Sequence, residues 1–484
     1  MTTPEEPNSR MSAAPQFFFA CMGVLAAWFG GMWLLWMAGV ESIYAHPTPF
    51  YALFAPVLPS LKGLLPALAA LGVGAWLLPR SAVGAHLLDP DSPPPDAART
   101  RRFLAGVFVF LCLFACAVAM CRNGLHGVSQ AYQREAYEYV GDIGKTSSIR
   151  ALFSRWLEIH PYLSMHSKVH PPGPVALLWA LSMLATRDAL ALSLATVLFG
   201  SLAVFPLFGW LRALFGPRAA AAGVLLYAVT PSVVLFTATS ADILFTPFTL
   251  AALWLFDRAL RENRPAAAAG AGAAYAAATL LKFSLLGLGA WFGLCGMALL
   301  ARRAAWPALL RTAAIMLAAF LAVHGLVRLW SGFDYLAAFQ AAMAQFNLDQ
   351  HHLDEITPRY PGIYFRLLFN PATWFYFAGI PVSLLFLRRC CTLRGVSPND
   401  GGGGAAALGP RATLLLLAAT AVAFNFLYLA RGEGERSALY LFPFLIAPAA
   451  HFLTEDRRAG LLPAALAAMA AQCLLTEAVF YTYW

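Results

Sequence analysis

Long apolar stretches, separated by short polar loops, follow one another along almost the whole chain of 484 residues. Each stretch holds about twenty residues with almost no charge, which is the length a helix needs to cross a lipid bilayer. The sequence therefore predicts an all-α fold, a polytopic transmembrane bundle of about thirteen spans. The predicted spans centre on residues 16–40, 50–79, 103–121, 189–211, 219–237, 243–257, 265–281, 284–301, 306–327, 371–387, 412–430, 437–453 and 460–481.

Arginine clusters fall on alternate loops between these spans. They are Arg80 with Arg99, Arg101 and Arg102; Arg212 with Arg218; Arg258, Arg261 and Arg264; Arg302 and Arg303; Arg388, Arg389 and Arg394; and Arg457 with Arg458. Basic loops stay in the cytoplasm, so these loops and the N-terminus are predicted to be cytoplasmic. We therefore expect a multi-pass protein of the cell (inner) membrane. Its extracytoplasmic loops would be 122–188, 238–242, the residues around 282, 329–370 and 431–436.

Composition agrees with this class and excludes several others. Hydrophobic residues make up 60% of the chain and charged residues 12%, whereas soluble domains carry about 25% charged residues. The net charge of +9 comes from arginines spread over loops, so no nucleic-acid partner is expected. The eight cysteines form no CxxC pair, residues 349–355 lack a familiar metal-ligand spacing, and no nucleotide-binding fingerprint is present. No motif indicates a cofactor, and the sequence assigns no metal ligand.

The first large outer loop, residues 122–188, is the most polar part of the chain. Apolar residues between 149 and 157 follow helical spacing, so the sequence predicts an amphipathic helix there that lies on the bilayer. Residues 174–185 are apolar but too few to span, and they are predicted to form a helix in the outer interface. This loop is where we expect the active site.

Three acidic residues of this loop are candidate general bases: Glu135, Glu138 and Asp142. A carboxylate at the membrane surface can take the proton of an acceptor hydroxyl. An ordinary solvated loop would also carry such residues, so their presence alone does not establish a site.

Three cationic or cationisable residues, His166, Lys168 and His170, precede the rigid turn Pro171-Pro172-Gly173-Pro174. Such a group suits the phosphate of a lipid. Contact with lipid headgroups is the simpler alternative, and the stiffness that the two prolines give this turn favours a functional site.

Two ionisable residues, Asp242 and Lys282, lie at the edges of predicted spans. Charges near hydrocarbon are costly and usually line a cavity, although Lys282 could also extend to the interface from a helix end. Glu435 and Arg436 belong to a compact charged outer turn. That turn is either an internally paired loop or one that directs an arginine toward a phosphate.

These motifs occur in an order that resembles a known superfamily over residues 103–450. The chain is similar to GT-C glycosyltransferases of the protein-mannosyltransferase and aminoarabinose-transferase-like group. The stretches that carry the resemblance are the acidic outer loop, the turn at 170–174, residues 212–216, the span ending near 242, the Leu-Lys pair at 281–282, and residues 332–335, 370–372, 434–436 and 442–443.

The resemblance implies an inverting transfer of a sugar from a polyprenyl-phosphate carrier. It implies an acidic residue of the outer loop as base, and Asp142 is the nearest match. The family's usual Asp-Glu pair is absent, so Glu138 and Glu135 remain alternatives. The family often places a cation for the lipid phosphate before the loop proline, and His170 occupies that position.

The sequence is thus interpreted as a membrane glycosyltransferase, hexosyl- or pentosyl-transferring, that acts on the extracytoplasmic face. The predicted partners are a polyprenyl-phosphate sugar, a lipid, glycan or protein acceptor, and the bilayer. Residues 1–102 are expected to precede a catalytic module at 103–330, and an outer loop with further spans would follow at 331–484. A transporter or flippase of lipid-linked saccharide is the alternative, and a non-catalytic scaffold is disfavoured by the ionisable loops. The expected sites are Asp142, Glu138 and Glu135 for catalysis, His170, Lys168, His166, Lys282 and Arg436 for the donor phosphate, and Asp242 and Glu435 as further candidates.

Overall fold

A computed structural model describes residues 13–39, 57–89, 91–356, 367, 369–396, 407–427, 434–455, 460–480 and 482, without the side chains of 35 and 350–356. These residues form helices and turns and contain no extended β-strand, which confirms the all-α prediction. The charged residues Arg431 and Glu433 of the late outer loop, and the side chains of residues 350–355, lie outside this description.

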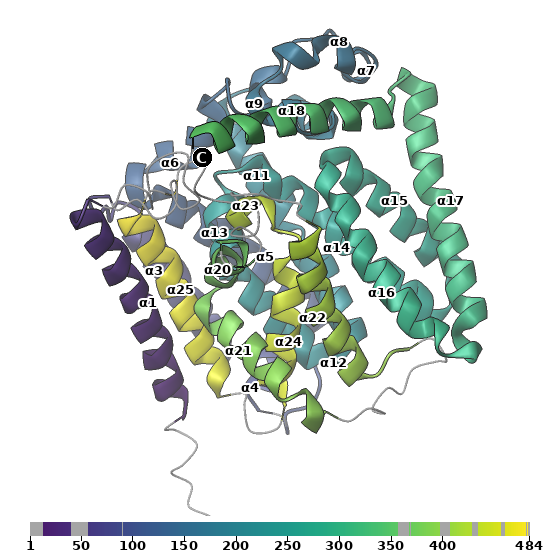
Figure 1. Ribbon diagram of the computed structural model, residues 1–484. Coiled ribbons are helices and arrows are strands. Elements are labelled where there is room, and N and C mark those ends of the chain that lie inside the picture. The colour runs from purple at the N-terminus through teal and green to yellow at the C-terminus, as the bar shows by residue number, and fades with distance from the viewer. Residues whose placement is uncertain are drawn as a thin grey trace, which may run out of the picture.

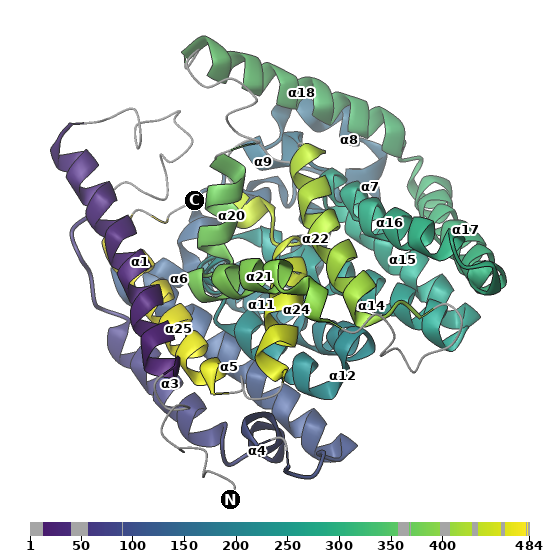
Figure 2. The same cartoon turned by 60° about the horizontal axis from the view of Figure 1, so that its bottom comes forward.

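The helices outside the first outer loop form one bundle, apart from α18, which lies across one end of it (Figures 1 and 2). In its N-terminal two thirds these are α1 (Ala13–Met37), α3 (Leu64–Leu77), α4 (Ala82–Leu88), α5 (Ala97–Asn123), α11 (Ala189–Ser201), α12 (Val204–Ala228), α13 (Pro231–Thr237), α14 (Thr246–Glu262), α15 (Pro265–Leu281), α16 (Gly289–Leu300) and α17 (Trp306–Ser331). Next come α18 (Tyr335–Ile356), α20 (Asn370–Phe377), α21 (Ile380–Cys391), α22 (Pro410–Phe426), α23 (Gly434–Ser437), α24 (Phe442–Thr454) and α25 (Leu461–Val479). Single 3-10 turns are η6 (Ala241–Phe245), η7 (Phe283–Leu288), η8 (Arg303–Ala305) and η10 (Leu393–Gly395).

The outer loop folds into a chain of short helices. They are α6 (Leu125–Ser129), η3 (Gln130–Gln133), η4 (Tyr139–Asp142), α7 (Ile149–Ser154), α8 (Trp156–Ile159), η5 (His160–Tyr162), α9 (Met165–Lys168) and α10 (Gly173–Leu184). Together with α18, the helices α7 to α9 lie across one end of the bundle, at the top of Figure 1. The loop is therefore an ordered layer over that end.

Seven helices among the described residues are long and apolar enough to cross a membrane, and an eighth results if the pair α3 and α4, bent by 77°, is one span. A polytopic membrane protein is thus confirmed, whereas the predicted number of thirteen spans is not. One predicted span is interrupted at a glycine, because Gly379, with φ 96°, separates α20 from α21 inside the predicted span 371–387. Gly216, with φ 87°, breaks the helical path within α12 in the predicted loop between the spans 189–211 and 219–237. Positive φ is accessible to glycine at little cost, so these breaks fall where the sequence permits them.

The predicted amphipathic helix at 149–158 exists but breaks at Arg155 into α7 and α8. Most of its apolar face packs on protein, which corrects the expectation that this face lies on lipid, although Leu157 is exposed. Leu152 and Trp156 are buried, and the Phe153 ring lies 5.4 Å from the Phe333 ring and 6.0 Å from the Trp330 ring. The end of α17 and the residues after it therefore cover this face.

The predicted interfacial helix is α10, a helix of 12 residues. Val175, Leu178 and Trp179 are buried, so α10 packs into the bundle. A Cβ atom on Gly173 would lie 2.1 Å from the carbonyl oxygen of Leu280. Only glycine permits this approach, and it brings the turn before α10 against the end of α15. The depth of α10 in a bilayer remains a prediction.

Candidate active site

A buried carboxylate, Asp242, lies between two buried cations. The Nζ atom of Lys282 is 3.3 Å from its Oδ1 atom, and the Nη1 atom of Arg436 is 3.8 Å from its Oδ2 atom. The relative exposure of the three residues is 5%, 4% and 3%. Charges buried this deeply are costly unless they are paired, so their conjunction indicates a polar site inside the bundle.

The helical hairpin of α14 and α15 explains why Asp242 meets Lys282. Each helix has 17 residues, and Asn263, with φ 54°, reverses the chain between them. Equal helices of about 26 Å that run in opposite directions bring the start of one beside the end of the other. Asp242 lies in η6 just before α14, and Lys282 directly follows α15.

Arg436 reaches the same site from the C-terminal part of the chain. It belongs to the short helix α23, which is fixed where the Ser232 hydroxyl donates to the carbonyl oxygen of Glu435. A Cβ atom on Gly434 would lie 2.8 Å from Nε1 of Trp374, so glycine lets α23 approach α20. The side chain of Glu435 is also buried, next to Arg436 in sequence.

His166 connects Arg436 to Glu138. The Nη2 atom of Arg436 lies 2.9 Å from Nε2 of His166, and Nδ1 of His166 lies 3.4 Å from Oε1 of Glu138. Because a guanidinium only donates, Nε2 of His166 must accept, which puts the ring proton on Nδ1 facing Glu138. Glu138 is 1% exposed, and neither of its carboxylate oxygens makes a hydrogen bond within the described residues.

His170 lies on the same side of the site. The Tyr139 ring is 5.9 Å from the His166 ring and 5.8 Å from the His170 ring. Burial, reinforced by the positive charge of Lys282, holds the pKa of His170 well below its usual value. The imidazole is therefore neutral near pH 7 and offers a hydrogen bond. Its Nδ1 atom is buried and has no hydrogen-bond partner in the part of the chain that is described.

Six of the residues predicted from sequence thus come together, namely Glu138, His166, His170, Asp242, Lys282 and Arg436. Glu135 is exposed. Lys168 is half-buried, and its backbone carbonyl binds Nε2 of His160. Within the described residues, the side chains of Glu135 and Lys168 form no hydrogen bond or ion pair with these six residues.

Asp142 is buried but faces a different set of partners. Its oxygens accept the amide of Ser164 at 3.0 and 3.1 Å and the Ser164 hydroxyl at 2.7 Å, and Nζ of Lys145 lies 2.7 Å from Oδ1. The partners Ser164 and Lys145, and the ring of Tyr139, were not singled out in the sequence. Neither residue type nor spacing gives a signal for such contacts.

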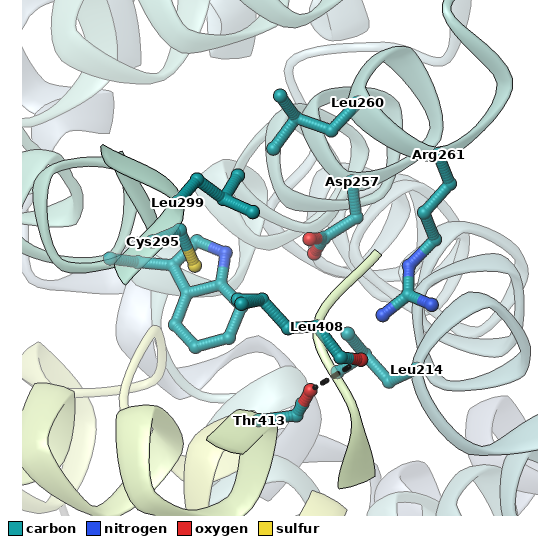
Figure 3. A pocket seen from close by; sticks show the side chains of 9 residues that line it. Leu214, Asp257, Leu260, Arg261, Cys295, Leu299, Leu408 and Thr413 are labelled. Atoms are coloured by element: carbon teal, nitrogen blue, oxygen red, sulfur yellow. Dashed lines mark hydrogen bonds between the residues drawn. The ribbon is translucent and has the colours of Figure 1, made fainter. Parts of the chain in front are cut away.

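A separate small cavity lies at the other end of α14, where Asp257 and Arg261 face Thr413 (Figure 3). Asp257 accepts a hydrogen bond of 2.6 Å from Nε1 of Trp210. Fifteen residues separate Asp257 from Asp242, roughly 20 Å along the helix. The cavity is therefore not part of the six-residue site.

Comparison with known proteins gives one finding that bears on this site. Residues 169–330 match the family model described as dolichyl-phosphate-mannose-protein mannosyltransferase. The matched segment contains His170, Asp242 and Lys282, whereas Glu138, His166 and Arg436 lie outside it. No curated protein matches the chain. The match confirms that the chain resembles the protein-mannosyltransferase group of GT-C glycosyltransferases, which are membrane enzymes that use polyprenyl-phosphate sugars.

Proposed function

We propose that this protein transfers a sugar from a polyprenyl-phosphate carrier to an acceptor on the extracytoplasmic face of the cell membrane. The family match supports a membrane glycosyltransferase with such a donor. The observation that carries the proposal is the buried contact of Lys282 and Arg436 with Asp242. The extracytoplasmic face rests on the alternation of arginine-rich loops.

The cations of this site suit the phosphate that leaves with the lipid. Charge-assisted hydrogen bonds have typical lengths of about 2.7–2.9 Å, and the contacts of Lys282 and Arg436 with Asp242 are longer, at 3.3 and 3.8 Å. Asp242 therefore orients the two cations without a short bond to either. Lys282, Arg436 and the N–H of His170 would stabilise the charge that develops on the phosphate oxygen.

Glu138 is the proposed base. The oxygen of the acceptor hydroxyl attacks the anomeric carbon, the bond from that carbon to the phosphate oxygen breaks, and its electron pair leaves with the polyprenyl phosphate. A base must take the hydroxyl proton. Glu138 is buried beside His166, whereas Glu135 is exposed and the oxygens of Asp142 are already hydrogen-bonded.

The proposed catalytic module remains residues 103–330, preceded by 1–102. The C-terminal part, 331–484, completes the site because it supplies Arg436.

The decisive experiment incubates the purified protein in vesicles with a panel of polyprenyl-phosphate sugars and an extract of candidate acceptors. The expected result is transfer of labelled sugar with release of polyprenyl phosphate, lost in Lys282→Gln and retained in Arg150→Gln. Arg150 is an exposed cation of the same loop layer, so this variant controls for charge alone. Movement of intact donor across the vesicle without release of polyprenyl phosphate would contradict the proposal and identify a flippase.

A further inference from the structure

Asp142 lies at the end of η4 and is fully buried, with 0% exposure. A carboxylate has about four lone-pair positions for hydrogen bonds. Four contacts fill them: two to the Ser164 amide, one to the Ser164 hydroxyl and one to the Lys145 ammonium. A carboxylate so occupied has no position left for the proton of an acceptor.

One of the two partners of Asp142, Ser164, belongs to the segment that carries the site histidines. Ser164 immediately precedes α9, the four-residue helix that contains His166. A helix this short cannot maintain itself by its own hydrogen bonds. The backbone amide of Met165 donates to the carbonyl of Ala136, and that of His166 to the carbonyl of Tyr137. Asp142 therefore holds Ser164 at the start of this segment. The next two residues, Met165 and His166, bond the backbone between Glu135 and Glu138.

Side-chain contacts extend this attachment in both directions. The single hydroxyl proton of Ser164 goes to Asp142, so the hydroxyl of Ser167, 3.1 Å away, must donate to Ser164. Lys145 joins Oδ1 of Asp142 to the carbonyl oxygen of Tyr162 at 2.7 Å. Residues on both sides of Ser164 are thus held to one carboxylate.

We propose that Asp142 is a positioning residue that holds the turn from Ser164 to His170, so that His166 stays between Glu138 and Arg436. This role deepens the proposed function and rests on it for its kinetic consequences. The role differs from that of a base, because it requires Asp142 to keep its contacts with Ser164 and Lys145 throughout the reaction.

Asp142→Asn and Ser164→Ala, alone and combined in the full-length protein, test the proposal. Asparagine replaces one acceptor oxygen with a donor that faces Ser164 and Lys145, and alanine removes the hydroxyl contact. Hydrogen exchange of the amides of residues 164–168 should accelerate about tenfold or more in Asp142→Asn and less in Ser164→Ala. In the double variant these amides should exchange no faster than in Asp142→Asn, because both substitutions disrupt the same contact between Asp142 and Ser164.

Donor kinetics provide the second measurement. Asp142→Asn should raise the KM for donor by about 10–100-fold, and Ser164→Ala should raise it less. Both variants should reduce kcat only a few-fold. Loss of a base would instead lower kcat by about 10²–10⁴ and leave Ser164→Ala active. The pH dependence of kcat should be unchanged in both variants.

Asp188→Asn is the matched control, since Asp188 caps α11 in the same loop and is exposed. It should alter neither exchange at 164–168 nor transfer. A large loss of kcat in Asp142→Asn with normal exchange would overturn the proposal, and so would faster exchange without any change in donor kinetics. Should the wild-type protein transfer no sugar from any donor, the proposed function alone would fail. The exchange rates would then still decide whether Asp142 holds the turn, and unchanged rates would overturn that role too.

Discussion

The guanidinium of Arg436 lies 2.9 Å from the imidazole of His166, although 270 positions separate the two residues in the chain. The same guanidinium contacts Asp242 through its other terminal nitrogen. Arg436 therefore links the outer loop to the helical hairpin, and the planar fork of an arginine suits two partners at once.

Replacement of Arg436 with lysine should reveal this double contact. Lysine keeps the charge but has a single ammonium, so it cannot reach Asp242 and His166 together. We expect kcat/KM for the donor to fall about 10–100-fold, which is the loss of one charge-assisted hydrogen bond. Arg150→Lys is the control and should behave as wild type. Equal kinetics in Arg436→Lys and wild type would show that the fork is not needed.

Glu138→Gln should stop turnover while donor still binds. Glutamine is nearly isosteric, but it cannot take the proton of the acceptor hydroxyl, and such a loss costs about 10²–10⁴ in rate. Donor affinity, measured by binding of a labelled polyprenyl-phosphate sugar, should stay within a few-fold of wild type. If Glu138→Gln turns over normally, Glu138 is not the base, and Glu135→Gln becomes the next test.

The residues of the site could be predicted from sequence, but the contacts between them could not. Asp242 and Lys282 stand out because charges are rare near apolar spans. Their pairing depends on the equal lengths of α14 and α15 and on the reversal at Asn263, which hydropathy does not determine to within a residue. Asp142 and Glu138 look equivalent in sequence, and only the 3-10 turn η4 directs one toward Ser164 and the other toward His166.

The predicted number of about thirteen spans is not confirmed, and the reason is related. Hydropathy records how many apolar residues follow one another, and it does not record where a helix breaks. Gly379 interrupts an apolar stretch that the pattern predicts as one span. The pattern also predicts that the face of Phe153 contacts lipid, whereas Phe333 covers it. Burial against protein and burial in lipid select the same residues, so the pattern alone cannot separate them.

Gly173→Ala should destabilise the protein through one close approach. The new Cβ atom would lie 2.1 Å from the carbonyl oxygen of Leu280, so α10 must move away from α15. Overpacking of this kind costs about 1–3 kcal/mol. The measurement is thermal unfolding in detergent, together with the KM for donor, which should rise because His170 moves with α10. Gly106→Ala, in α5 with open space around it, should be neutral or slightly stabilising. Equal melting temperatures of Gly173→Ala and Gly106→Ala would contradict the close approach of Gly173 to Leu280.

The stability of the protein should fall in mild acid because of His170. Its pKa in the folded protein is well below 6.5, the ordinary value, so the unfolded chain binds the proton first. The contribution of the neutral imidazole is therefore complete above pH 6.5 and decreases as the pH falls below it. Melting temperatures between pH 7.5 and 5 should fall for wild type and change less for His170→Gln. Parallel curves for the two proteins would argue against this role of His170.

The orientation of the bundle can be tested by labelling from one side. The arginine pattern predicts that residue 150 is extracytoplasmic and residue 394 cytoplasmic. Arg150→Cys and Arg394→Cys would each be made in a variant whose eight native cysteines are replaced with serine. An impermeant maleimide added to intact cells should label the first and leave the second unlabelled until the membrane is opened. The controls are the cysteine-free parent, which should stay unlabelled, and opened cells, in which both variants should react. Labelling of both positions in intact cells would overturn the orientation, and with it the extracytoplasmic placement of Glu138, His166 and Arg436.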